Sequence, residues 1–282
     1  MFTLIAQNKY GEQLELTHNA AYNITEIDGI DPPDATINTT KNAGADGSVF
    51  NSAYMNNRTI TITLVVNAPA ETNRLTLYQY FKSKFPVRLY YSNSSREVYI
   101  DGYVQSMTVG FFDKKQTVQI VIFCPQPHFN GVNESVQEFA SIESLFEFPF
   151  DIPAAGVEFS SILTNVEQSI INNGDLDTGT IITIQATGQV VTPKIYNVDT
   201  GELFILNTTL QDGDLVTINT RRGEKSITLL RAGVTSNLIG SLADGSTWFE
   251  LIPGDNVFTV AADSLVENMI VTFSLIDQYE GV

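Results

Sequence analysis

The sequence predicts a mainly β protein with two domains, and three observations carry that prediction. Thr, Val, Ile and Asn are abundant while charged residues make up only 17% of the chain, which favours sheet over helix. Strand-like alternation and turn residues recur along the chain, at intervals of about 8–14 residues in its second half. The length of 282 residues exceeds the usual size of one domain, so we expect two domains of about 130–150 residues.

The first half is expected to be a sheet-rich domain, residues 1–130. Residues 36–57 are rich in Asn, Gly, Ala, Ser and Thr, which predicts a long excursion or an extended hairpin. The strongly alternating segment 58–66 places Ile60, Ile62 and Leu64 on one face. The expected strands of this half are 2–7, 21–27, 58–66, 87–91, 97–106 and 117–123, and the two prolines of 124–129 end the domain.

One helix is expected in this half, over residues 69–85. Pro69 suits a first turn, Glu71 favours the N-terminal end of the helix dipole, and Pro86 stops the helix. Lys82 and Lys84 favour the other end of the dipole. The apolar stripe that should lie on the sheet consists of Leu75, Tyr78, Phe81 or Lys82, and Phe85.

The second half, residues 131–282, is expected to form a β-sandwich or jelly roll. Residues 131–168 are a connector that should pack, because a floppy tether would not carry four phenylalanines: Phe139, Phe146, Phe148 and Phe150. Nine strands are expected beyond it, at 169–172, 180–186, 192–197, 203–206, 215–219, 226–230, 247–251, 256–261 and 269–276.

Charge divides the two halves. Residues 1–130 hold 10 Lys and Arg against 11 Asp and Glu, a net charge of −1, whereas residues 131–282 hold 5 against 21, a net of −16. The acidic half argues against binding to nucleic acid or to an anionic membrane surface, because both are negatively charged. Acidity that simply keeps a β-rich protein soluble is an equally good explanation.

Cysteine content and targeting signals narrow the compartment. Cys124 is the single cysteine, so no intramolecular disulfide forms, which fits assembly in a reducing compartment. The first residues lack a basic segment followed by a long apolar core, so no signal peptide is expected. No apolar stretch approaches the ~20 residues that span a bilayer.

Few residues suit catalysis or metal binding. Two histidines, His18 and His128, and Cys124 do not make a zinc site at normal ligand spacing, and neither histidine has a nucleophile elbow nearby. An EF-hand loop that starts at Asn173 would need a bidentate Glu at its twelfth position, where this chain has Ile184. We therefore expect no metal and no cofactor.

Paired carboxylates and the single tryptophan offer weaker candidates. Glu143 with Glu147, and Asp212 with Asp214, are conceivable glycosidase pairs, but chance pairs are expected among 32 acidic residues. Trp248 is conceivable as a sugar-stacking platform, although we expect it in a strand, within a core or a subunit interface. The sequence thus predicts no enzyme.

The order of several short motifs resembles one structural family. Residues 86–91 (Pro-Val-Arg-Leu-Tyr-Tyr), 96–104 (Arg-Glu-Val-Tyr-Ile-Asp-Gly-Tyr-Val) and 124–129 (Cys-Pro-Gln-Pro-His-Phe) resemble the N-terminal domain of the distal tail proteins of long, non-contractile-tailed bacteriophages. Residues 146–150, 171–179, 200–202 and 248–256 resemble the C-terminal domain of the same family. The signature residues of this resemblance are Arg96, Gly102, Tyr103, Cys124, Pro127, Asn173, Gly174, Asp175, Trp248, Pro253, Gly254 and Asn256.

The resemblance implies an architecture and a set of partners. The N-terminal part would be a belt domain with one helix and a protruding hairpin, six copies of which form a ring around the tail channel. The C-terminal part would be a galectin-like β-sandwich at the ring's periphery. The ring would join the tail-tube protein to a tail-associated protein or lysin, and would anchor receptor-binding or baseplate proteins. Such a protein is made in the cytoplasm of the bacterial host and ends at the tail tip of the virion.

Two other functions stay open from the sequence. A β-sandwich carbohydrate-binding module for host adhesion would show a shallow groove with exposed aromatic side chains. A glycoside hydrolase would show a cleft with two converging carboxylates. The hub interpretation instead predicts that residues 36–57, which are small, polar and weakly patterned, are ordered by a neighbouring subunit.

Overall fold

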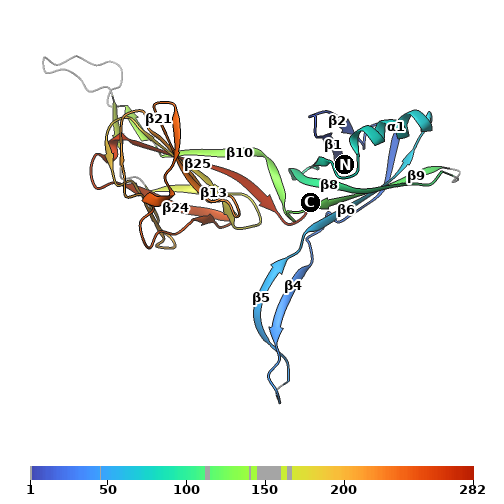
Figure 1. Ribbon diagram of the computed structural model, residues 1–282, viewed down its shortest axis with the longest axis horizontal. Helices are drawn as coiled ribbons and strands as arrows, with labels where there is room; N and C mark the ends of the chain where they lie inside the picture. The colour runs from blue at the N-terminus through green and yellow to red at the C-terminus, as the bar shows by residue number, and fades with distance from the viewer. Residues whose placement is uncertain (1, 45, 112–114, 140, 145–159, 164–166) are drawn as a thin grey trace. The chain divides into compact units, whose positions relative to one another are not determined.

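The computed structural model describes residues 2–44, 46–111, 115–139, 141–144, 160–163 and 167–282 (Figure 1). Four residues named above, Phe146, Glu147, Phe148 and Phe150, lie outside the described residues, as does the side chain of Glu143. Among the described residues, the helices are too short or too polar to cross a bilayer.

The chain folds into two compact units. Unit 1 comprises residues 1–132 together with 278–282, and unit 2 comprises residues 133–277. Strand β10 (Phe129–Phe139) leads out of unit 1, and strand β25 (Met269–Tyr279) leads back to it. We call residues 278–282 the return segment, because they belong to unit 1 although unit 2 separates them from it in sequence.

Unit 1 is a strongly bent antiparallel sheet around one core. The long strand β8 pairs with β7 through residues 97–103 and with β9 through residues 103–109, with a bulge between Val104 and Ser106. This bulge lets one strand belong to two layers. The order is β2-β1-β7-β8-β9-β6-β3. The strands span β1 Thr3–Asn8, β2 Gln13–Glu15, β3 Tyr22–Asp28, β6 Arg58–Val66, β7 Pro86–Ser92, β8 Glu97–Val109 and β9 Gln116–Cys124.

The expected alternation in the first half is confirmed. Ile60, Ile62 and Leu64 on β6 are buried, and they pack against residues of β8 and β9 such as Val104 and Ile120. Burial of one such side chain is worth about 1.5–3 kcal/mol. The hydrophobic core of unit 1 therefore lies between the two layers of the bent sheet.

The segment 36–57 forms the extended hairpin, which was one of the two expected alternatives. Strands β4 (Ala35–Thr40) and β5 (Val49–Met55) pair with each other in a separate two-stranded sheet. The hairpin extends away from the sheet of unit 1 (Figure 1). We call this hairpin the ribbon.

The helix is shorter than expected, and of the predicted apolar stripe only Phe81 is buried. Helix α1 spans Ala70–Tyr80, and the residues that face the core are Leu77 and Phe81. Leu75 and Tyr78 are 49% and 36% exposed, so they point away from the core. The chain leaves the helix at Phe81, which places Phe85 and the two lysines beyond its last turn. Two inward-facing residues four positions apart are enough to pack this short helix against the core of unit 1.

Unit 2 is a β-sandwich, so the mainly β prediction is confirmed. Phe258 on β24 and Phe273 on β25 come from different sheets, and their ring centroids lie 4.9 Å apart in one core. One sheet contains β25, β15 (Ile181–Ala186), β20 (Leu215–Asn219), β21 (Ser226–Arg231) and β22 (Val234–Asn237), and the other contains β13 (Gln168–Asn172), β24 (Gly254–Ala261), β17 (Lys194–Asn197) and β18 (Leu203–Ile205).

Short pairs complete unit 2, and several were not expected. They are β11 (Ser141–Ser144) with β12 (Ser160–Leu163), β14 (Thr178–Gly179) with β23 (Glu250–Leu251), and β16 (Val190–Val191) with β19 (Thr209–Leu210). The expected strand 247–251 is reduced to β23, so the prediction of Trp248 in a strand is wrong. Residues 246–249 approach the core as an irregular segment, and Trp248 lies within it.

Candidate interaction surfaces

The ribbon has two chemically different faces. Cross-strand partners share a face, and the register pairs Ala35 with Met55, Ile37 with Ala53, and Thr39 with Phe50. We call this set the apolar face. Ile37 and Phe50 are each 63% exposed on it.

The opposite face, which we call the polar face, consists of Thr36, Asn38, Thr40, Val49, Ser52 and Tyr54. Three hydrogen bonds between side chains run along it. The amide of Asn38 donates to Ser52 Oγ at 3.0 Å, that of Asn51 to Thr40 Oγ1 at 2.6 Å, and that of Asn56 to Thr36 Oγ1 at 2.9 Å. Because this face satisfies its own polar groups, the apolar face is the one that gains most from being covered.

Exposed aromatic side chains gather in unit 1. Among the described residues, every aromatic side chain that is largely exposed belongs to this unit: Tyr10, Phe50, Tyr54, Tyr78, Phe85, Tyr103 and Phe111. Some are covered by cations, since Lys9 Nζ lies 4.0 Å from the Phe85 ring centroid and the Arg74 guanidinium 4.9 Å from that of Phe111. Aromatic and arginine side chains are enriched where proteins bind one another, so unit 1 offers the association surfaces.

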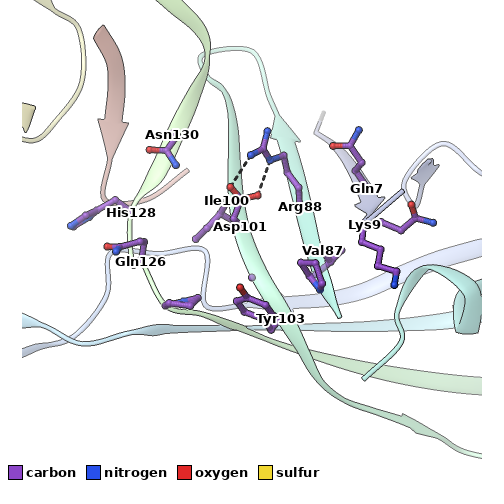
Figure 2. Close-up of a pocket in the computed structure, with 14 residues that line it drawn as sticks. Gln7, Lys9, Val87, Arg88, Ile100, Asp101, Tyr103, Gln126, His128 and Asn130 are labelled. Carbon is purple, nitrogen blue, oxygen red and sulfur yellow. Dashed lines mark hydrogen bonds and ion pairs between the residues drawn. The ribbon is translucent and has the colours of Figure 1, made fainter. Parts of the chain in front are cut away.

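A cavity of about 510 Å³ lies beside strands β7 and β8 of unit 1 (Figure 2). Arg88 and Asp101 stand in its wall as a bidentate ion pair, with N–O distances of 2.7 and 2.8 Å. The hydrogen bonds to Asp101 raise the pKa of Arg88. Tyr103 and His128 also line the cavity. The Asp101 carboxylate is thus engaged on both oxygens by the guanidinium of Arg88.

The root of the ribbon is organised by a buried arginine, Arg58, which is 3% exposed. Its guanidinium donates to the carbonyl oxygens of Pro127 at 2.6 Å and of Gly29 and Asp31, both at 2.7 Å. It also donates to the carbonyl oxygen of Glu280 in the return segment. Four acceptors from three separate stretches of chain therefore converge on one side chain.

Arg58 also has an aromatic ring and a thiol as neighbours. The Arg58 guanidinium lies 4.7 Å from the Phe129 ring centroid. Burial is the main influence that lowers the pKa of Arg58, and charges nearby oppose that shift. Burial also raises the pKa of the neighbouring Cys124 thiol to about 12. This thiol is therefore a packing group and not a nucleophile.

The signature residues of unit 1 make contacts within this unit. Arg96 donates to the carbonyl oxygen of Gly281 and lies over the Tyr279 ring at 4.5 Å. Gly102 faces Cys124, since a Cβ on this glycine would lie 2.9 Å from the Cys124 sulfur. Pro127 supplies a carbonyl oxygen to Arg58, and Tyr103 is 49% exposed at the cavity.

In unit 2 the structure brings the two signature turns together. Strands β13 and β24 pair so that Asn172 lies opposite Gly254, which places residues 173–175 near 253–256. The Asn256 amide donates to the carbonyl oxygens of Ile252 at 2.8 Å and Gly254 at 3.0 Å. Gly254 has φ +94°, a left-handed conformation that glycine adopts without strain. These residues hold the turns in place.

The remaining signature residues of unit 2 follow the same pattern. The backbone N–H of Asn173 donates to Asp277 Oδ1 at 3.1 Å, and that of Gly174 to Asn172 Oδ1 at 2.9 Å. Pro253 lies in the turn that precedes β24, and Asp175 lies in the turn that follows β13.

Trp248 is partly buried against the core of unit 2. Its ring meets that of Phe204 edge-on, with the centroids 5.6 Å apart. The described part of unit 2 shows no largely exposed aromatic side chain, so it offers no platform of the kind that a carbohydrate-binding module presents.

Asp214, one of the two residues of the candidate acid pair Asp212 and Asp214, forms an ion pair with Arg231. Asp214 is buried and accepts two hydrogen bonds from Arg231, at 2.8 and 2.5 Å. The hydrogen bonds to Arg231 lower the pKa of Asp214 below its ordinary value of 3.8. A carboxyl with a lowered pKa is a poor general acid. Within the described ranges, His, Cys, Asp and Glu form no group of three able to hold a metal ion.

Sequence analysis missed Arg58 and the two faces of the ribbon. A signal for Arg58 was present, because it shares the phase of Ile60, Ile62 and Leu64 along β6 and therefore points inward with them. The faces were harder to find. The register of the ribbon shifts after Asn38, so simple alternation through β5 misassigns one side.

In its described residues the chain combines a β-sandwich with an exposed ribbon and exposed aromatic side chains, an arrangement typical of structural assembly proteins. Comparisons with known proteins identify the family. Residues 9–124 match the phage tail protein RIFT-related domain, and residues 173–275 match the C-terminal domain of the siphovirus-type tail component. A comparison with curated proteins gave no match.

Solved structures agree with these matches. The chain is similar to the Dit protein of phage SPP1, described as a paradigm of the hub adsorption apparatus in phages that infect Gram-positive bacteria. The identity is 14%, the TM-score 0.67, and the match covers 98% of this chain and 99% of that one. It is also similar to a chain of the phage P2 baseplate in its activated conformation with calcium, at 11% identity, TM-score 0.52 and full coverage of both chains.

The chain belongs to the siphophage distal tail protein family. It is a structural component of the phage tail and baseplate, and its place is the tail of the virion. Its partners are other tail proteins.

Proposed function

We propose that six copies of this chain form a ring at the distal end of the tail tube, in which unit 1 makes the contacts between subunits. The ring joins the tail-tube protein to a tail-associated protein or lysin, and it anchors receptor-binding or baseplate proteins. Unit 2 is a galectin-like sandwich at the periphery of the ring.

The observation that carries this proposal is the exposed apolar face of the ribbon. An isolated two-stranded hairpin is only marginally stable in water, and both of its outer edges carry unpaired backbone groups. With Ile37 and Phe50 each 63% exposed, the ribbon gains stability when a neighbouring surface covers that face. A neighbouring unit 1 offers such a surface in its exposed aromatic side chains.

Charge supports the same assignment. Unit 1 holds 10 Lys and Arg against 12 Asp and Glu, a net charge of −2, and unit 2 holds 5 against 20, a net of −15. Six strongly charged units packed closely would repel one another, whereas near-neutral units do not. The acidic unit is therefore better placed outside the ring contacts.

Light scattering on the purified protein, with negative-stain images of the same fraction, tests the proposal. A six-fold ring, or a monomer–hexamer equilibrium that depends on concentration, is the expected result. A strict monomer at high concentration, without rings on the grid, would overturn it and favour a carbohydrate-binding module. Glycan binding would then be measured.

A deletion tests the role of the ribbon. A variant that lacks residues 40–51 is expected to keep both cores folded and to lose the ring, because the tip and the first three residues of β5 are removed while no core residue is touched. A ring formed by this variant would show that the contacts between subunits lie elsewhere.

A further inference from the structure

The root of the ribbon is a close meeting of two legs. Residues 29–34 lead into β4, and residues 56–58 lead out of β5. A Cβ on Gly29 would collide with the carbonyl oxygen of Thr59, the residue that follows the second leg, and Gly29 has φ +83°. The two legs therefore touch backbone to backbone, and Arg58 ties them by donating across the gap to Gly29 and Asp31.

The return segment closes on the first of these legs. The backbone N–H of Val282 donates to the carbonyl oxygen of Ile30 at 3.2 Å. A Cβ on Gly281 would lie 2.9 Å from Pro32 Cδ and 3.1 Å from Pro32 N, so the segment passes directly against this leg. The carbonyl oxygens of Glu280 and Gly281 accept from Arg58 and Arg96 respectively.

The direction of the ribbon depends on its root. Among the described residues, β4 and β5 pair only with each other, so ladder hydrogen bonds to the main sheet do not orient them. Hydrogen bonds to a charged donor are among the stronger ones in proteins, and loss of one partner leaves a buried polar group unsatisfied. Arg58 is 3% exposed, and its guanidinium donates to four carbonyl oxygens. These hydrogen bonds therefore hold the root of the ribbon in one position.

We propose that the return segment clamps the root of the ribbon and that Arg58 is the positioning residue through which it does so. The clamp fixes the direction in which the ribbon leaves unit 1. This inference goes beyond the proposed ring, because the direction of the ribbon is measured within one subunit.

Distance measurement by electron paramagnetic resonance tests the clamp. Nitroxides are attached to Ser48→Cys, near the ribbon tip, and to Thr108→Cys on β8 of the same unit, in samples diluted with unlabelled protein. Cys124 does not take the label, because it is fully buried. The parent is expected to give one narrow distribution of distances between the two nitroxides. In Arg58→Met this distribution is expected to become broad.

A milder variant guards against a folding defect. Gly281→Val leaves Arg58 intact but forces the return segment away from Pro32, and it is also expected to broaden the distribution. If Arg58→Met exposes Cys124 to a thiol reagent, unit 1 has opened and Gly281→Val alone decides. An unchanged narrow distance in Gly281→Val would overturn the proposal.

A matched control shows that the effect is specific to the root. Arg88→Met removes another arginine of the same sheet, one whose partner is Asp101 and not the return segment. It is expected to keep the narrow distance. Broadening by Arg88→Met as large as that by Arg58→Met would also overturn the proposal, because the ribbon would then respond to any loss of an arginine.

Discussion

Units 1 and 2 are both built mainly from β-strands, but they differ in net charge and in where their aromatic side chains lie. In the described part of unit 2, Phe249, Phe258 and Phe273 pack against one another in one core, and the unit carries a net charge of −15. Unit 1 is near neutral, with a net charge of −2, and displays aromatic side chains and a ribbon outside its core. The described residues of unit 2 thus keep their aromatic side chains in a core, whereas unit 1 keeps several outside its core, as our proposal that unit 1 makes the ring contacts requires.

Two single residues allow each unit to be followed separately. The only cysteine, Cys124, is buried in unit 1, and the only tryptophan, Trp248, packs against the core of unit 2. Reaction of Cys124 with a thiol reagent therefore reports the opening of unit 1. Fluorescence of Trp248 reports the unfolding of unit 2. The predictions below use these two signals.

The largest effect is expected from charges on the apolar face of the ribbon. Ile37→Lys combined with Phe50→Lys should weaken ring association by about 100-fold or more, because buried anchor residues are worth about 2 kcal/mol or more each. Neither side chain packs in the core, so Cys124 and Trp248 should keep their native signals. Light scattering over a dilution series measures the change.

The matched control adds the same charge to the polar face, as Asn38→Lys combined with Ser52→Lys. Association is expected to stay within a few-fold of the parent. If this variant loses the ring while the apolar-face variant keeps it, our assignment of the two faces is reversed.

Two leucines of α1 allow a buried and an exposed side chain of unit 1 to be compared. Leu77 is fully buried, so Leu77→Ala should lower the free energy of unfolding of unit 1 by about 2–5 kcal/mol. Leu75 is 49% exposed, so Leu75→Ala should change it by less than about 0.5 kcal/mol. The rate of Cys124 modification in denaturant measures both. Equal losses would mean that the helix packs through the stripe that the sequence first predicted.

In unit 2, the ion pair between the buried Asp214 and the partly exposed Arg231 should dominate the response to acid. Asp214→Asn is expected to destabilise this unit by about 1–2 kcal/mol at neutral pH, because Arg231 loses its charged partner but stays accessible to water. Since Arg231 lowers the folded-state pKa of Asp214 below 3.8, the pair stabilises the unit fully above that value. That stabilisation is lost as the pH falls through the lowered pKa.

Trp248 fluorescence during urea unfolding at several pH values tests this prediction. The parent should lose part of its stability below pH 3.8, and Asp214→Asn should lack that part. The Cys124 signal of unit 1 should not change. A parent and a variant with the same pH profile would contradict the role of this ion pair.

The smallest effect is expected from the exposed ion pair of unit 1. The Asp101 side chain is 60% exposed and that of Arg88 is 37% exposed, so solvent screens their attraction. Asp101→Asn should therefore cost no more than about 1 kcal/mol in the unfolding of unit 1. A loss as large as that of Asp214→Asn would show that the wall of the cavity is more rigid than its exposure indicates.

The sequence was sufficient wherever local pattern decides the structure. The alternation of residues 58–66 predicted β6 and its inward residues, and the turn residues predicted most strands of the sandwich. The resemblance to distal tail proteins rested on short turns such as 253–256, whose conformation Gly254 and Asn256 fix locally. Such features leave a signal within a few residues.

The remaining features depend on contacts that leave little local signal. Arg58 meets Glu280 across 222 positions of sequence, so nothing near either residue predicts the contact. The two-residue strand β16 exists only because β19 pairs with it. The helix stripe failed because Leu75 and Leu77 are equally apolar, and only the position of the sheet decides which one is buried.

The return segment also sets an order in which the chain can be completed during its synthesis. Unit 2 lies between the two parts of unit 1, so a ribosome must translate residues 133–277 before the return segment exists. At typical rates this takes on the order of ten seconds. Throughout that time Arg58 lacks the acceptor on Glu280, and the root of the ribbon is incomplete. A chain that stops anywhere in unit 2 never gains this contact, so an intact root marks a subunit whose second unit has been fully translated.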